Sequence, residues 1–223
     1  MKNLYHYPIC PLSRQVRIYF KELDLPFTMI KEDYWLQNAK FLKINPAGTL
    51  PVIEETSGLF IAGIYPIIEY FHDKYPNFNF MAEDSDTRAE IRRLLVWFND
   101  KFYREITKIL IDEKVIRLMA NIGAPRSEFL RAAKANLAHH MSYLSNLLEG
   151  GCSFLGSDQL SAADIAASCH LSVLDYFGEI NWDKYPFVRH WYSILKSRPS
   201  FRLILQDQLP GFTPSVTYSD LDF

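Results

Sequence analysis

Residues 45–53 read NPAGTLPVI, and the rest of the fold can be worked out from them. The segment Asn45–Gly48 is a turn signal, and Pro51 stands directly before the apolar residues of a strand. A proline at that place is unusual unless its peptide bond is cis. We therefore expect a cis Leu50–Pro51 bond that presents the Leu50 backbone to an extended peptide. The alternative is that Pro51 simply begins a strand.

The residues on either side of this stretch alternate between strand and helix patterns. The strand candidates are residues 3–7, 27–30, 50–53 and 59–62, and the helix candidates are 12–23, 66–74 and, more weakly, 34–44. This order predicts a βαβ unit followed by a ββα unit. We assign residues 1–76 to an α/β domain with a thioredoxin-like layout.

The remainder of the chain follows helical spacing. Residues 77–86 are rich in acids and asparagine and are interpreted as a linker. Residues 87–209 hold five or so helices, of which the one beginning after Ser161 is apolar all round and is expected to be central and buried. Residues 210–223 show no period and are treated as a tail. The sequence thus predicts an α/β domain followed by an all-α domain.

Composition excludes several classes of function. The chain has 223 residues, 24 basic against 26 acidic side chains, and 48% hydrophobic residues. This near-neutral balance offers no basic footprint for nucleic acid. No stretch is long and apolar enough for a membrane helix, and the N-terminus lacks a signal-peptide pattern, so we expect a cytoplasmic protein. No metal-ligand or nucleotide motif occurs, so we expect no metal and no bound nucleotide.

Cys10 is the candidate reactive group. It follows a strand and opens a helix in the sequence CPLS, and Ser13 of the same segment is a second candidate catalytic residue. A helix N-terminus stabilises a thiolate and would lower the pKa of the cysteine. The alternative is a small apolar residue at a strand end. Cys152 and Cys169 are interpreted as inert packing residues.

Two further features are assigned to folding. Ser161 and Asp164 have the spacing of a capping box at the start of the apolar helix. His170 lies inside that helix and is expected to be a core histidine with satisfied hydrogen bonds, in preference to a catalytic base.

Together, CPLSRQVRI, NPAGTLPVI, IIEYF and SAADIA resemble the cytosolic glutathione-transferase superfamily over essentially the whole chain. The resemblance implies a homodimer with a site near the domain interface. It also implies that Cys10 takes the catalytic or glutathione-contacting position, as in the omega-type classes, and that Leu50 pairs with the glutathione backbone. A glutathione-dependent transferase or thiol transferase using Cys10 is therefore one functional hypothesis.

The glutathione site departs from the family pattern at Gly63 and Ile64. Active members have Glu or Gln followed by Ser there, and these groups bind the γ-glutamyl end. A branched hydrocarbon cannot replace a hydroxyl, and Pro66 removes one N–H from the helix start. An unpaired charged ligand end costs about 1–3 kcal/mol, which is roughly tenfold to a few hundredfold in affinity. We expect no cofactor, and glutathione binding at most weakly.

The ending LPGFTPSVTYSDLDF and the segment KEDYW at 31–35 resemble one branch of the superfamily, the transferase-like bacterial cell-division proteins. This resemblance implies a homodimer that binds FtsZ filaments at the division site, without transferase chemistry. The expected partner-binding residues are Trp35, Tyr218, Asp220, Leu221, Asp222 and Phe223. The alternative is that the tail packs on its own domain or is disordered. A ligand carrier using the interdomain cleft is a third, weaker hypothesis.

Aromatic residues make up 15% of the chain. Phe98 and Phe102 fit the core. Other aromatic residues fall in loops, helix starts and the tail, where such residues are enriched at interfaces. These are Tyr34, Trp35, Tyr65, Tyr75, Phe78, Phe80, Tyr218 and Phe223. We expect them to form dimer and partner surfaces.

Overall fold

The computed structural model of the protein describes residues 1–149 and 153–221. In its N-terminal part, strands pair in the order β2-β1-β3-β4. They are β1 (Lys2–His6), β2 (Phe27–Lys31), β3 (Val52–Glu54) and β4 (Phe60–Ala62). β1 is parallel to β2 and antiparallel to β3, which is antiparallel to β4. This topology confirms the predicted βαβ–ββα order.

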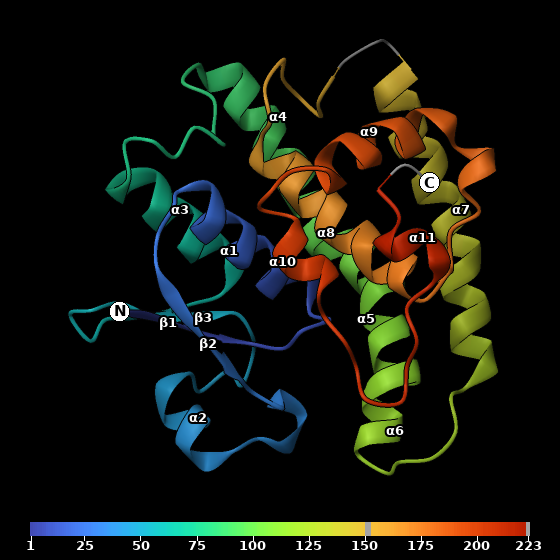
Figure 1. Cartoon of the computed structure of the whole chain (residues 1–223), viewed down its shortest axis with the longest axis horizontal. Helices are drawn as coiled ribbons and strands as arrows, with labels where there is room; N and C mark the ends of the chain where they lie inside the picture. The colour runs from blue at the N-terminus through green and yellow to red at the C-terminus, as the bar shows by residue number, and fades with distance from the viewer. Residues whose placement is uncertain (150–152, 222–223) are drawn as a thin grey trace.

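Helices cover both faces of this sheet. α1 (Pro11–Glu22) and α3 (Ile64–Lys74) lie on one face, and α2 (Ala39–Ile44) lies on the other (Figure 1). The 3₁₀ turn η1 (Tyr34–Leu36) precedes α2 and ends at Gln37, which adopts a left-handed φ of 48°. The weak helical pattern predicted over 34–44 is therefore two short pieces.

The second part of the chain is helical, as predicted. Its segments are α4 (Ser85–Val96), η2 (Trp97–Thr107), α5 (Lys108–Leu110), η3 (Ile111–Ile116), α6 (Arg117–Met119), α7 (Ser127–Glu149), α8 (Ala162–Tyr176), η4 (Trp182–Lys184), α9 (Pro186–Lys196), α10 (Arg202–Leu205) and α11 (Val216–Ser219). From α4 to α6 they join into one long helix, in which η2 and η3 have π-helical winding. Within the described residues, no helix combines the length and apolar character needed to cross a bilayer.

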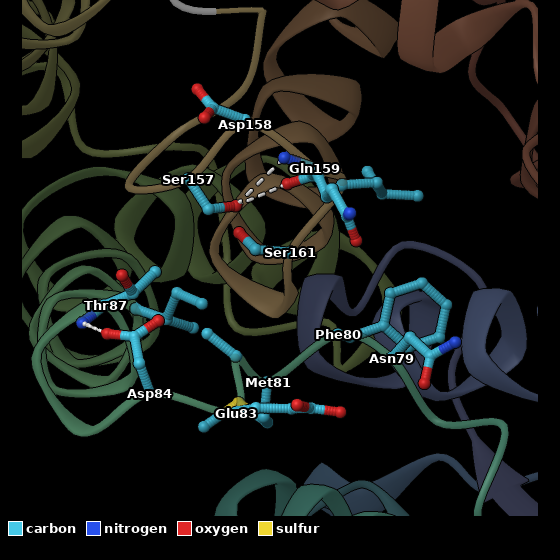
Figure 2. A pocket seen from close by; sticks show the side chains of 13 residues that line it. Asn79, Phe80, Met81, Glu83, Asp84, Thr87, Ser157, Asp158, Gln159 and Ser161 are labelled. Atoms are coloured by element: carbon cyan, nitrogen blue, oxygen red, sulfur yellow. Dashed lines mark hydrogen bonds between the residues drawn. The ribbon is translucent and has the colours of Figure 1, made fainter.

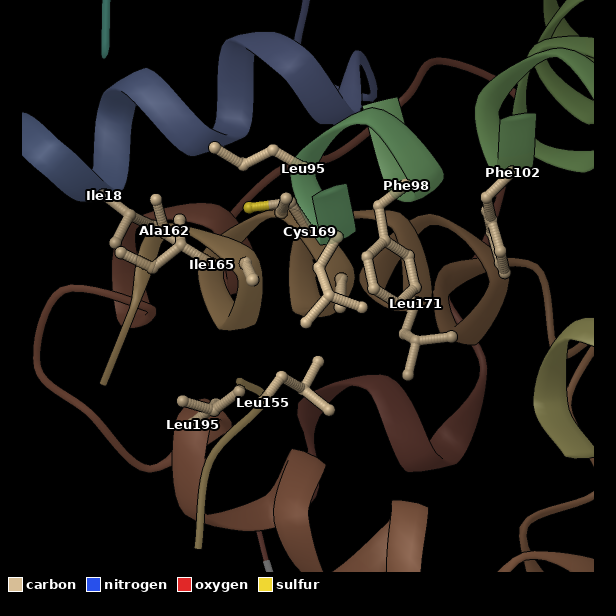
Figure 3. Packing of buried hydrophobic residues seen from close by; sticks show 14 of the residues in the cluster. Ile18, Leu95, Phe98, Phe102, Leu155, Ala162, Ile165, Cys169, Leu171 and Leu195 are labelled. Atoms are coloured by element: carbon tan, nitrogen blue, oxygen red, sulfur yellow. The ribbon is translucent and has the colours of Figure 1, made fainter. Parts of the chain in front are cut away.

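α8 forms the centre of the molecule, and every one of its residues is buried. Figure 3 shows Cys169 of α8 in one buried cluster with Ile18 of α1 and Leu95 of α4. Cys169 is a packing residue, as predicted, and Cys152 lies outside the described residues. α1 of the N-terminal part contacts α8 of the helical part directly, so these two helices join the two parts of the chain into one core.

The predicted capping box is present at the start of α8. The Ser161 side chain accepts from the Asp164 backbone, and the Asp164 side chain accepts from the Ser161 backbone. Asp164 also accepts from the Leu155 backbone at 2.7 Å and from Trp191 Nε1 at 3.0 Å. One buried carboxylate thus fixes the helix start, the preceding loop and α9.

Some aromatic residues that were predicted to lie on interfaces are buried in the core. Phe78 and Phe80, expected on an interface, are buried in the core. Their rings lie 5.2 and 5.6 Å from the ring of Tyr19 on α1. The segment before α4 therefore packs against α1 and forms part of the core. Tyr65, in contrast, remains 38% exposed.

Candidate functional site around Cys10

Cys10 lies at the end of the connection between β1 and α1. It is the N-cap residue of α1, its backbone N–H donates to Tyr7 O at 3.0 Å, and Pro11 begins the helix. The Cys10 side chain makes no capping hydrogen bond. The sequence therefore placed the thiol correctly, at the start of a helix.

Burial controls the chemistry of this thiol. Cys10 is 6% exposed and packs in an apolar cluster with Tyr7 and Leu50. Desolvation raises the pKa of the thiol above its usual range, although the Ser13 hydroxyl and the backbone N–H groups of Leu12 and Ser13 act in the opposite direction. The expectation of a lowered pKa is wrong, because loss of solvation outweighs the helix terminus.

Two tyrosines from different domains approach Cys10. Burial raises the pKa of Tyr34, in η1, and of Tyr103, in η2, and interaction with Cys10 contributes to both shifts. Both hydroxyls are therefore neutral at physiological pH. Tyr103 was not predicted, because the spacing of ordinary helices does not show which way a π-helical segment turns its side chains.

Trp35 belongs to the same aromatic group. Its ring meets Tyr7 edge-on at 4.9 Å and Tyr34 at 5.5 Å. Trp35 is half-buried, so part of its surface stays accessible beside the site. Its predicted role in partner binding stays a prediction.

The predicted loop before β3 has the expected conformation. The Leu50–Pro51 bond is cis, and both residues are buried. Asn45 holds the loop: its side-chain amide donates to Thr49 O at 2.8 Å and its Oδ1 accepts from the Ala47 N–H at 3.2 Å. The loop thus reaches the Cys10 cluster through Leu50.

The start of α3 borders this loop. The Gly63 N–H donates to Pro51 O at 2.9 Å, and Gly63 adopts a φ of 90° as the N-cap of α3. Ile64 is 4% exposed and belongs to the main apolar core. Gly63 therefore has no side chain to offer a ligand, and the Ile64 side chain is used for packing.

Comparison with known proteins agrees with this layout. A protein-family model described as "Glutathione S-transferase, N-terminal domain" matches residues 4–79. FtsZ-localized protein A of Caulobacter vibrioides is 39% identical over 225 residues, which cover all of this chain and 98% of that protein. The chain belongs to the glutathione S-transferase superfamily.

Solved structures of this superfamily superpose over the whole chain. The structure of FzlA from C. crescentus matches with a TM-score of 0.95 and 39% identity, covering 100% of this chain and 99% of that one. A glutathione S-transferase from Rhodospirillum rubrum F11 matches with a TM-score of 0.96 and 40% identity, covering 100% of both chains. The glutathione-transferase fold predicted from the sequence is confirmed.

Of the two predicted arrangements of the tail, the structure supports packing on its own domain, through α11. Tyr218, expected on a partner surface, is fully buried. Its hydroxyl accepts from Arg14 Nη2 at 2.9 Å and donates to Ile204 O at 2.6 Å. Asp220 is exposed and Leu221 half-buried, so their partner role stays a prediction. Asp222 and Phe223 lie outside the described residues.

A separate cleft of about 540 Å³ lies between the linker and the loop before α8 (Figure 2). Its acidic side chains are Glu83, Asp84 and Asp158. Asp84 accepts from the Thr87 N–H at 2.8 Å as the N-cap of α4, and Ser157 donates to Gln159 O at 2.6 Å. Much of the cleft's polar chemistry therefore serves local turns and caps. We assign it no ligand.

Proposed function

We propose that this protein is a homodimer that binds FtsZ filaments in the cytoplasm, at the division site, and regulates constriction without transferase chemistry. The carrying observation is the similarity to FtsZ-localized protein A, which spans the whole chain including the tail. The Cys10 site supports a binding role, because a buried thiol with a raised pKa is a poor nucleophile at neutral pH.

A surface between α3 and α4 supports the dimer. It contains a groove of about 180 Å³ lined by Tyr65, Ile68, Glu69, Arg92, Leu95 and Val96. Val96 is 52% exposed, and Glu69 and Arg92 form a half-exposed ion pair. Apolar groups beside charges of both signs make this face self-complementary across a two-fold axis.

Co-sedimentation with polymerised FtsZ tests the proposal. We expect the intact protein to pellet with filaments, and a variant lacking residues 221–223 to bind about tenfold more weakly, because it removes Leu221 and Phe223 from the tail. Light scattering on the same sample should give twice the chain mass of 26.0 kDa.

The exposed Phe187 on α9 provides a control for this experiment. Phe187→Ser removes a large apolar side chain that is 46% exposed and should leave pelleting unchanged. If the intact dimer stays in the supernatant with filaments present, the proposed function is wrong.

The alternative is a thiol transferase, favoured by the position of Cys10 beside Leu50 and Pro51. We expect millimolar glutathione to leave the melting temperature of the protein unchanged, because a ligand stabilises only above its dissociation constant. Ile64→Ser should gain a glutathione-dependent rise, since it restores a hydroxyl at the start of α3.

Ile64→Val is the matched control, because it changes packing without adding a donor. Each variant is compared with itself, with and without glutathione, so the cost of removing the buried Ile64 side chain cancels. A clear rise in the unaltered protein, together with rapid alkylation of Cys10 at neutral pH, would establish the transferase hypothesis instead.

A further inference from the structure

The corner between α6 and α7 exposes large apolar side chains. We define this α6–α7 corner as residues 117–134. Leu118 is 56% exposed, Ile122 59% and Phe129 40%. Large apolar side chains grouped on a monomer surface mark interaction sites more often than scattered ones do.

The corner is built rigidly enough to act as a surface. Buried Glu113 accepts from the Arg126 N–H at 2.9 Å and from Arg126 Nε at 3.0 Å, and it pairs with Arg117 at 3.4 Å. The Arg126 guanidinium lies 4.0 Å from the centroid of the Phe129 ring. The start of α6 and the residue that precedes α7 are therefore tied to one carboxylate.

The corner is also positively charged. Its cations are Arg117, Arg126, Arg131 and Lys134, against the acids Glu128 and the tied Glu113. On the long helix before it, several exposed cations are paired within their own helix, as in Arg104–Asp100 and Lys108–Asp112. Among the described residues, neither Arg131 nor Lys134 has a carboxylate within ion-pair distance. Arg131 and Lys134 are thus available to pair with acidic side chains of another protein.

We propose that the α6–α7 corner docks an acidic segment of the filament that carries apolar side chains. This inference rests on the proposed function and locates the contact on a surface separate from the tail. Ile122 and Leu118 would be covered by the apolar side chains, and Arg131 and Lys134 would pair with the acids. Attraction between opposite charges also makes the contact sensitive to salt.

Charge reversal tests the surface. We expect Arg131→Glu/Lys134→Glu to weaken pelleting with FtsZ filaments about tenfold and to flatten its salt dependence. The matched control is Lys184→Glu/Arg202→Glu, which makes the same charge change at two exposed positions elsewhere. For the apolar part, Ile122→Ser should weaken pelleting similarly, and Ile194→Ser, at a position that is 41% exposed on α9, should not.

The outcomes separate the inference from the function beneath it. If the intact protein pellets and the corner variants pellet equally well, the corner is not the contact and the proposed function stands. If the intact protein does not pellet, both the corner contact and the proposed function are wrong. If the corner variants change the mass seen by light scattering, this face joins copies of the chain, and the filament assignment is wrong.

Discussion

Lys196→Met is expected to destabilise the protein by about 3 kcal/mol and to lower its melting temperature by roughly 6–12 °C. The Lys196 side chain is fully buried under the tail. Its Nζ donates to Asp220 O at 2.6 Å and to Thr217 O, and it pairs with Asp175 Oδ2 at 3.4 Å. Methionine matches the length of the side chain but leaves these acceptors without their donor.

The loss is local as well as global. Thr217 Oγ1 and Ser215 Oγ still donate to Asp175, so α11 keeps part of its attachment to α8. We expect amide hydrogen exchange in residues 215–220 to accelerate in Lys196→Met before the core exchanges. Filament binding should weaken in parallel, because Asp220 and Leu221 lose their fixed position.

Lys184→Met is the control, since Lys184 is exposed on η4 and its replacement should change the melting temperature little. If the tail amides of Lys196→Met exchange as slowly as those of the unaltered protein, Lys196 does not anchor the tail.

The features predicted correctly depend on neighbouring residues. The cis bond at Pro51 follows from its place between a turn and a strand, and the capping box of Ser161 and Asp164 from a spacing of three residues. The order of strands and helices follows from hydrophobic periods in the same way. Such signals are complete within a few residues, so they can be predicted from the sequence without knowing the tertiary fold.

The features predicted wrongly depend on residues far apart in the chain. Tyr218 is buried because its hydroxyl meets Arg14, which lies 204 positions earlier. The Cys10 thiol is shielded by an apolar cluster that includes Leu209 and Tyr218. No short pattern records these pairings. Local patterns therefore left both a packed and a partner-binding tail open, and both a reactive and an inert thiol, and tertiary packing favours the packed tail and the shielded thiol.

Lowering the pH from 7 to 5 is expected to reduce the free energy of unfolding by about 2–3 kcal/mol. Burial lowers the pKa of His170 to about 3 and that of His6 to about 4, so both are neutral in the fold. In the unfolded chain, histidine titrates near 6.5, at about its ordinary pKa. Below that pH the unfolded state binds more protons, and each histidine costs about 2 kcal/mol at pH 5.

Asp164 acts in the opposite direction. Burial raises its pKa to about 6, so it takes up a proton more readily in the fold than in the unfolded chain. On acidification to pH 5, protonation of Asp164 therefore adds about 1 kcal/mol to the free energy of unfolding, and the net loss is smaller than the two histidines alone would give.

His170→Gln isolates the largest contribution. His170 Nδ1 lies 3.0 Å from Thr107 Oγ1 and Nε2 lies 3.2 Å from Asn99 Oδ1, so the neutral ring satisfies both groups. Glutamine keeps hydrogen-bonding capacity and cannot be protonated in this range. Urea unfolding at pH 7 and pH 5 should show a pH-dependent loss about 2 kcal/mol smaller in this variant. His139→Gln, at an exposed site on α7, should leave the loss unchanged. An equal loss in His170→Gln and the unaltered protein would mean that the His170 ring does not stay neutral in the fold, since a buried neutral histidine must be protonated on acid unfolding.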